Sequence, residues 1–157
     1  MEKETNVFIP LVTIRLVKEK ALPYGKASVC NSEQVVKLAN QIVEGADREY
    51  VMVLSVDSKS CPVAIEVISI GTLTEALVSG REVYKHCIQC GAAGGILIHN
   101  HPSGNPTPSK EDYLMTEKLN KVARLLGIEF LDHIIVGDEG RYYSMSENGD
   151  IRCEIGA

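Results

Sequence analysis

A short apolar run that ends in two histidines places the strongest limit on how this chain folds. Gly94 to Ile98 reads GGILI, which is typical of a buried strand, and it leads directly into His99-Asn100-His101-Pro102. Pro102 cannot donate a backbone hydrogen bond, so we expect the strand to end there. Alternate residues of an extended chain point to the same side, so His99 and His101 can both face one ion.

The residues after this strand can return a carboxylate to the two histidines. A loop rich in proline, glycine and asparagine runs from Pro102 to Pro108, and a helix pattern begins near Ser109 with Asp112 in its first turn. Two histidines and one carboxylate leave a fourth position for water, which is the composition of a catalytic zinc site. The sequence therefore predicts a Zn²⁺ ion held by His99, His101 and Asp112.

Simpler interpretations of the same residues exist. A His-x-His pair alone is often two half-exposed strand residues with no metal. Ser109-x-x-Asp112 is also the pattern of a helix cap followed by a first-turn acid. Capping does not account for two histidines at the end of an apolar strand, and the joint spacing favours the metal site. For Ser109 we predict a catalytic role as well, donating a hydrogen bond to the oxyanion of a tetrahedral intermediate.

The rest of the chain alternates between strand and helix patterns. Three helices are expected to begin at Asn31 or Ser32, at Ser79 and near Ser109, and to end at Gly45, Gly91 and Gly127. The other expected strands are 50–56 and 63–70, which form an antiparallel hairpin, then 128–136 and a short strand near 142–143. This order predicts a single α/β domain with a mixed β-sheet flanked by helices.

Composition narrows the setting in which the chain works. A length of 157 residues is the size of one domain, and five cysteines, an odd number, are more typical of reduced thiols than of a disulfide framework. No apolar run approaches the roughly 20 residues that span a bilayer, and the first residues lack the pattern of a signal peptide. We therefore expect a cytoplasmic protein with no membrane partner. Self-association is compatible with the sequence.

The string HNHPSGNPTPSKED, from His99 to Asp112, matches the JAMM motif of JAB/MPN-type metallopeptidases. Together with GTL at 71–73, REV at 81–83 and LDHIIVGD at 131–138, it resembles the RadC family from about Ser32 to about Glu147. The resemblance implies a JAB/MPN-like (cytidine-deaminase-like) domain over 31–150, with an extended segment over 1–30 and a tail over 151–157. It also implies a zinc-dependent hydrolase that cleaves a peptide or isopeptide bond in a peptide or protein substrate.

Proteins with this motif also use a glutamate from earlier in the chain to hold the zinc-bound water and move its proton. Two residues compete for that role here. Glu49 opens the first strand of the hairpin, where such proteins carry this residue, and Glu66 lies within the second strand. We favour Glu49 as the catalytic base. For either glutamate the simpler interpretation is an ordinary surface acid on a strand.

Two other functions remain as alternatives to hydrolysis. One is a DNA repair or nucleic-acid-processing accessory protein, and the other is a non-catalytic interaction module that merely holds metal. Longer RadC-like proteins carry an N-terminal helix-hairpin-helix region that binds DNA, and the roughly thirty residues before the first helix are too few for it. An intact set of His, His, Asp and Ser argues against the non-catalytic module.

Three remaining patterns receive structural interpretations. Cys87-Ile-Gln-Cys90 has no second cysteine pair, so two cysteines at a helix end are expected rather than a zinc ribbon. Asp132-His133 on a buried strand is expected to be structural and is left out of the site. His86 is expected to be a surface residue of its helix.

The charge of the chain gives a prediction about DNA. The net charge is −5, and the 16 basic residues are spread among 21 acidic ones without a basic run. Binding that depends on phosphate contacts needs lysines and arginines gathered on one face, so duplex DNA should bind more weakly than about 10 μM near physiological salt. A fluorescence-anisotropy titration with labelled duplex and single strands at two salt concentrations measures this. Sub-micromolar binding that weakens steeply with salt would instead favour the nucleic-acid function.

Overall fold

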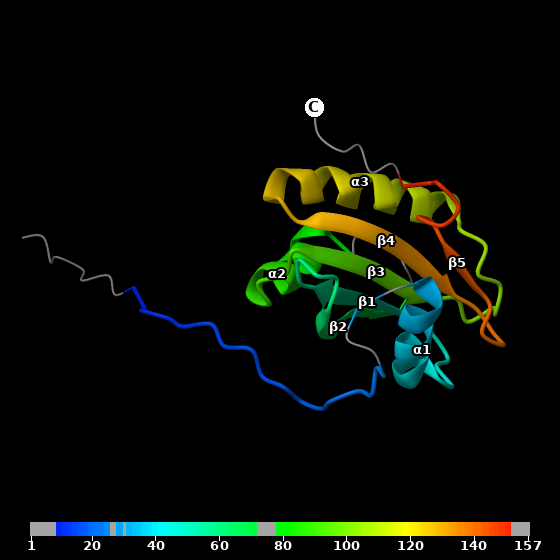
Figure 1. Ribbon diagram of the computed structural model, residues 1–157, viewed down its shortest axis with the longest axis horizontal. Helices are drawn as coiled ribbons and strands as arrows, with labels where there is room; N and C mark the ends of the chain where they lie inside the picture. The colour runs from blue at the N-terminus through cyan, green and yellow to red at the C-terminus, as the bar shows by residue number, and fades with distance from the viewer. Residues whose placement is uncertain (1–8, 26–27, 30, 72–77, 152–157) are drawn as a thin grey trace, which may run out of the picture.

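The chain folds around one mixed β-sheet, shown in the computed structural model of Figure 1. The structure describes residues 9–25, 28–29, 31–71 and 78–151. In chain order its elements are α1 (Ser32–Val43), β1 (Glu49–Val56), β2 (Pro62–Gly71), α2 (Gly80–Gln89), β3 (Gly94–Asn100), α3 (Lys110–Leu126), β4 (Glu129–Val136) and β5 (Tyr142–Ser144). The predicted α/β fold class with a mixed sheet flanked by helices is confirmed.

The strand order β2-β1-β3-β4-β5 follows from three kinds of connection. β1 and β2 form the predicted antiparallel hairpin, and β1 also pairs antiparallel with β3. β3 and β4 are parallel, because α3 carries the chain back across the sheet between them. This β3-α3-β4 unit brings the end of β3, the start of α3 and the middle of β4 close to one another.

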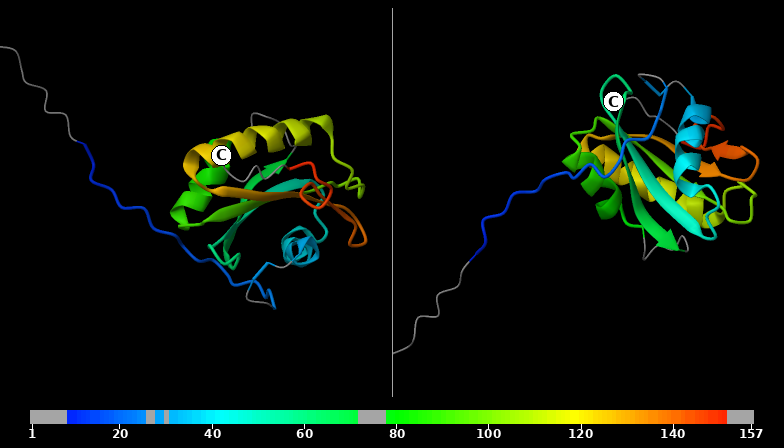
Figure 2. Two further views of the ribbon diagram at one scale, coloured as in Figure 1. Left: turned by 45° about the horizontal axis from the view of Figure 1, so that its top comes forward. Right: turned by 90° about the horizontal axis from the view of Figure 1, so that it is seen from below.

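Helices cover both faces of the sheet, as Figure 2 shows. α2 and α3 pack on one face, over a core that includes Val53, Leu97 and Leu119. α1 packs on the other face, over a core that includes Met52, Leu54 and Ile98. Alternate residues of β1 and β3 therefore enter different cores, which explains why both strands read as continuous apolar runs.

The helix ends match the expected capping residues. Asn31 caps α1, Ser79 caps α2 and Ser109 caps α3, each with a side-chain oxygen that accepts from a backbone N–H in the first turn. Gly127 ends α3 in the left-handed conformation, with φ of 66°. These caps set where α3 begins, and with it the position of Asp112.

Some features noted in the sequence are not described by the structure. Thr72 and Leu73 of the GTL string, and Cys30 and Cys153, lie outside the described residues. Within the segment 1–30, residues 9–25 and 28–29 are described and contain no helix or strand. None of the helices found in the described parts of the chain has the length and apolar character needed to cross a lipid bilayer.

Candidate metal centre

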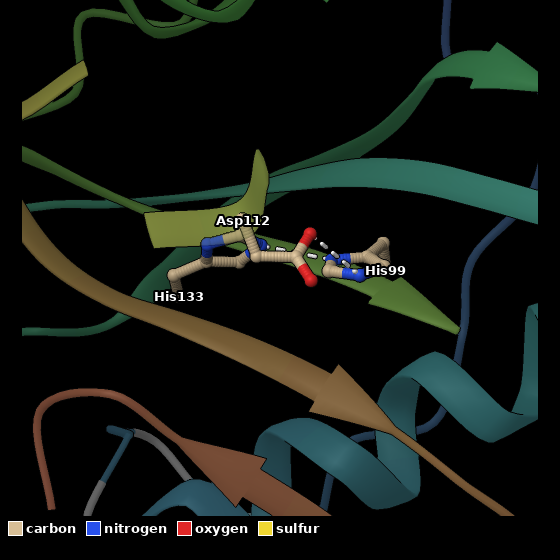
Figure 3. Close-up of side chains that lie close together, drawn as sticks. All are labelled: His99, Asp112 and His133. Atoms are coloured by element: carbon tan, nitrogen blue, oxygen red, sulfur yellow. Dashed lines mark hydrogen bonds and ion pairs between the residues drawn. The ribbon is translucent and has the colours of Figure 1, made fainter. Parts of the chain in front are cut away.

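The three predicted ligands meet at the carboxyl end of β3, below the first turn of α3. His99 is the next-to-last residue of β3, and Asp112 lies in the first turn of α3; both are fully buried. Figure 3 shows the carboxylate of Asp112 pointing toward His99. His101 follows β3 directly, and its side chain keeps 16% of its surface exposed. One side of the group therefore faces solvent while the rest is enclosed.

The loop between β3 and α3 is held down by its own backbone. The N–H of His101 donates to the carbonyl of Val136, which extends the ladder with β4 by one residue. The N–H of Gly104 donates to the carbonyl of His101, and the N–H of Asp138 donates to the carbonyl of Gly104. Gly104 has φ of 76° and lies so close to Asp138 that a side chain at this position would collide with it. This turn returns the chain to the histidines.

The ligand atoms of these residues are spaced as a small cation requires. The Nε2 atoms of His99 and His101 are 3.0 Å apart. The Oδ1 atom of Asp112 lies 3.3 Å from Nε2 of His99, and its Oδ2 atom lies 3.7 Å from Nε2 of His101. Tetrahedral zinc with ordinary bond lengths separates its ligand atoms by roughly 3.4 Å. The structure thus brings His99, His101 and Asp112 together at a spacing that fits a metal ion.

The carboxylate of Asp112 provides the most direct test of that fit. Its Oδ2 atom accepts hydrogen bonds from the backbone N–H and the hydroxyl of Ser109, both at 2.7 Å. Its Oδ1 atom is the one buried side-chain oxygen or nitrogen, within the described ranges, that has no hydrogen-bond partner. Leaving a buried charged acceptor unpaired costs more than the about 1–3 kcal/mol of a neutral group. A cation beside Oδ1 and the two imidazoles would remove that cost.

The proton on His101 is assigned by the group that it contacts. Its Nδ1 atom lies 2.8 Å from the carbonyl oxygen of Asn105. A carbonyl oxygen can only accept, so Nδ1 of His101 carries a proton and donates it. In the neutral ring, Nε2 then holds a free lone pair that faces His99 and Asp112.

The proton on His99 is assigned by a chain of hydrogen bonds through His133. The hydroxyl of Thr116 donates to the carbonyl of Asp112 at 2.8 Å, so its oxygen accepts from Nδ1 of His133 at 2.6 Å. Nε2 of His133 is then an acceptor, and it lies 2.8 Å from Nδ1 of His99. His99 therefore donates from Nδ1 and presents the lone pair of Nε2 to the site. These tautomers are inferred from the hydrogen-bond network.

Burial keeps both inner histidines neutral. Desolvation lowers the pKa of His99 to about 4, with the charge of Asp112 opposing this shift and that of His101 adding to it. Desolvation also lowers the pKa of His133 well below its usual value, with smaller effects in the same direction from His99 and His101. A neutral imidazole is the form that binds a metal, so the two rings need not lose a proton first.

His133 is the residue that the sequence interpretation left out of the site. It is fully buried, and ligand atoms of His99, Asp112 and His133 all lie within 4.8 Å of one another. Two ligand sets are therefore compatible with the positions, one with His101 and one with His133. We favour His101, because its Nε2 faces Asp112, whereas Nε2 of His133 is used by Nδ1 of His99. In the sequence, His133 stands out only as part of the pair Asp132-His133. Nothing in that pair indicates that His133 contacts His99.

The two candidate bases occupy different surroundings. Val51 pairs with His99, so strand alternation places Glu49 on the face of the sheet that carries His99, level with His101. Glu66 lies on β2 opposite Val53, and its carboxylate is 2.8 Å from Nδ1 of His86. His86, on α2, is buried, so the expectation that it is a surface residue is wrong. Glu66 is thus engaged away from the metal centre.

Ser109 is placed as a helix cap in this structure. Its side chain accepts from the backbone N–H of Asp112 at 3.2 Å, while the side chain of Asp112 accepts from the backbone N–H of Ser109. This reciprocal capping box is the simpler interpretation of Ser109-x-x-Asp112, and the geometry supports it. The serine hydroxyl also points its proton at Asp112, so it orients the carboxylate toward the histidines.

These contacts predict the effects of two histidine substitutions on metal binding. The purified chain should hold about one zinc, and His101→Ala should lose it because a ligand is removed. The His133→Phe variant should still bind zinc, but about 10–100-fold more weakly, because phenylalanine cannot accept the hydrogen bond from Nδ1 of His99 that orients this ring. Elemental analysis and a chelator competition measure these two quantities.

His86→Phe is a matched control, because His86 is also a buried histidine on the α2 and α3 side of the sheet. Its zinc affinity should equal that of the unchanged chain. If His133→Phe abolishes zinc binding while His101→Ala retains it, the ligands are instead His99, Asp112 and His133.

Comparison with known proteins places this chain in a family. The family model described as a RadC-like JAB domain matches residues 29–150. A UPF0758 protein of Methanosarcina barkeri is 42% identical over 127 residues, which cover 81% of this chain and 55% of the relative. UPF0758 proteins of Caldanaerobacter subterraneus subsp. tengcongensis and Thermotoga maritima are 43% and 39% identical, over 78% and 77% of this chain and 52% and 54% of their own lengths. The chain spans about half the length of these relatives, and it belongs to the RadC-like JAB domain family.

Proposed function

We propose that this chain is a zinc-dependent hydrolase of the JAMM type that cleaves a peptide or isopeptide bond. The observation that carries the proposal is the unpaired, buried Oδ1 of Asp112, which faces Nε2 of His99 and lies beside His101. When bound there, a zinc ion polarises a water molecule and lowers its pKa towards about 7. Membership of the RadC-like JAB domain family supports the same assignment.

The open side of the centre gives a substrate a way in. A cavity of about 440 Å³ lies at the carboxyl ends of β3 and β4, and His101 and Pro102 form part of its wall. The turn that follows β4 and the last turn of α1 complete the lining. In α/β sheets, ligands bind at the carboxyl ends of parallel strands, as they would here. Of the proposed ligands, His101 alone lines this cavity, and we propose that a substrate approaches the centre past it.

Glu49 is the residue that we propose takes the proton of the attacking water. The amide of Asn100 holds the start of β1 beside the histidines: its oxygen accepts from the N–H of Tyr50 at 2.8 Å, and its nitrogen donates to the carbonyl of Arg48 at 3.1 Å. Glu49 lies between these two anchored residues. These bonds hold the backbone on both sides of Glu49, and we propose that its carboxylate accepts the proton and delivers it to the leaving amine.

Ser109 has two roles in the proposal. Its hydroxyl donates to Asp112, and Ser109 as a whole is an exposed residue. Rotation of that hydroxyl away from Asp112 would direct its proton toward a substrate carbonyl, where negative charge develops during attack. The backbone N–H of Ser109 keeps its bond to Asp112 meanwhile, so the carboxylate stays oriented.

The role of Glu49 predicts a separation of metal binding from turnover. Glu49→Gln should lower hydrolysis at least 10²-fold and leave zinc content unchanged, because the residue acts on the water and not on the metal. Digestion of a peptide library, read by mass spectrometry, and elemental analysis on the same sample check both. Glu66→Gln is the matched control, because Glu66 is also a strand glutamate but contacts His86. The Glu66→Gln variant should cleave peptides at the normal rate. The reverse pattern would transfer the role to Glu66.

The role of Ser109 predicts a loss that capping alone does not cause. Ser109→Ala should lower kcat by about 10²–10³ with zinc still bound. It should also cost about 1 kcal/mol of stability, as loss of a cap does. Ser79→Ala, which removes the corresponding cap of α2, should cost similar stability without affecting kcat. If Ser109→Ala and Ser79→Ala change both quantities alike, Ser109 is a cap and nothing more.

A further inference from the structure

A segment that precedes the domain exposes apolar side chains to solvent. We call residues 9–20 the arm; it runs extended and leads away from the sheet in Figures 1 and 2. Its large apolar residues are 55–102% exposed: Ile9, Leu11, Val12, Ile14, Leu16 and Val17. No arm residue makes a hydrogen bond to another described residue. A contiguous apolar surface of this kind in a soluble chain marks a contact site.

The sequence of the arm is that of a strand without a partner. It is rich in β-branched residues, and apolar side chains occur at both odd and even positions, as in a strand whose two sides are both covered. Its backbone donors and acceptors lack partners among the described residues. The arm, with twelve residues, is long enough to pair along the whole of β2, which has ten.

The sheet of the same chain offers the complementary edge. β2 is the outermost strand on one side, and the described residues pair with it only through β1. Val63 and Ile70 on β2 are 47% and 54% exposed. The opposite edge strand, β5, has three residues and is too short to hold the arm. An unpaired edge of this length is a template for an added strand.

Two observations favour a second copy of the chain as the owner of that edge. The chain is anchored just after the arm, where Gln41 donates to the carbonyl of Pro23 and the N–H of Val29 donates to the carbonyl of Ser60. From there the arm leads away from the sheet (Figure 1). The arm also carries three basic residues against one acidic residue, Glu19, whereas the whole chain has a net charge of −5. β2 itself carries one charged side chain, the acidic Glu66, so the basic arm meets no like charge on that strand.

We infer that the arm of one copy adds as a strand to the outer edge of β2 in a second copy, and that the exchange is reciprocal. A reciprocal exchange uses the same two surfaces on each copy and closes after two chains. Each arm then satisfies its backbone groups on β2, and its apolar side chains extend the two cores beyond the present edge of the sheet. The product is a two-fold dimer.

Sedimentation velocity on the full chain tests this inference. At about 100 μM, the unchanged chain should sediment as a species with twice the monomer mass. Ile14→Pro should be monomeric, because proline removes a backbone donor from the arm. Val63→Lys with Ile70→Lys should also be monomeric, because charge on the edge repels the basic arm. The matched controls Ile14→Val and Val63→Thr with Ile70→Thr should remain dimers. Circular dichroism and thermal unfolding show whether each variant is folded.

A mixture of the two monomeric variants distinguishes exchange from other contacts. The Ile14→Pro chain keeps an intact edge, and the Lys variant keeps an intact arm, so the mixture should form a heterodimer through one arm and one edge. A monomeric unchanged chain would overturn the inference, and so would a dimer that persists in the Ile14→Pro variant. Either result is independent of zinc binding and hydrolysis, which involve other residues.

Discussion

The buried carboxylate of Asp112 is the interaction on which the arrangement of this molecule depends. A fully buried acid needs compensation, and the protein supplies it unevenly. Oδ2 receives two hydrogen bonds from Ser109, which is also the residue that begins α3. Oδ1 receives none and faces the histidine at the end of β3. The start of the helix, the end of the strand and the charge between them are therefore parts of one arrangement.

This arrangement explains why the grouping of His99, His101 and Asp112 could be predicted from the sequence. His99 and His101 alternate at the end of an apolar strand, and Ser109 and Asp112 have the spacing of a capping box, so both patterns are local. The strands and helices follow equally local signals, such as Gly127 at the end of α3 and the polar turn at 57–60 between β1 and β2. These patterns need no knowledge of which distant residues meet.

The histidines that sequence reasoning misjudged depend on register and packing. His133 pairs with Leu97 and reaches His99 as a diagonal neighbour, after an irregularity in the β3–β4 ladder near Gly95. No local pattern reveals that register. His86 lies on α2 among polar residues, yet it is buried and its Nδ1 contacts Glu66 from β2. In both cases the contacting residue comes from a strand that is distant in the sequence, so the burial and contacts of the histidine depend on tertiary structure.

The proposed metal ligands and the proposed base come from different parts of the chain, and this has a consequence for how such proteins diverge. Everything proposed to hold the ion, including His133 and Thr116, comes from the single β3-α3-β4 unit, whereas Glu49 comes from β1, outside that unit. On the proposed assignment, one substitution at Glu49 would therefore remove hydrolysis and leave the proposed zinc ligands in place. If the assignment holds, a homologue could lose activity by a single substitution and still bind metal, so its metal content alone would not show whether it is active.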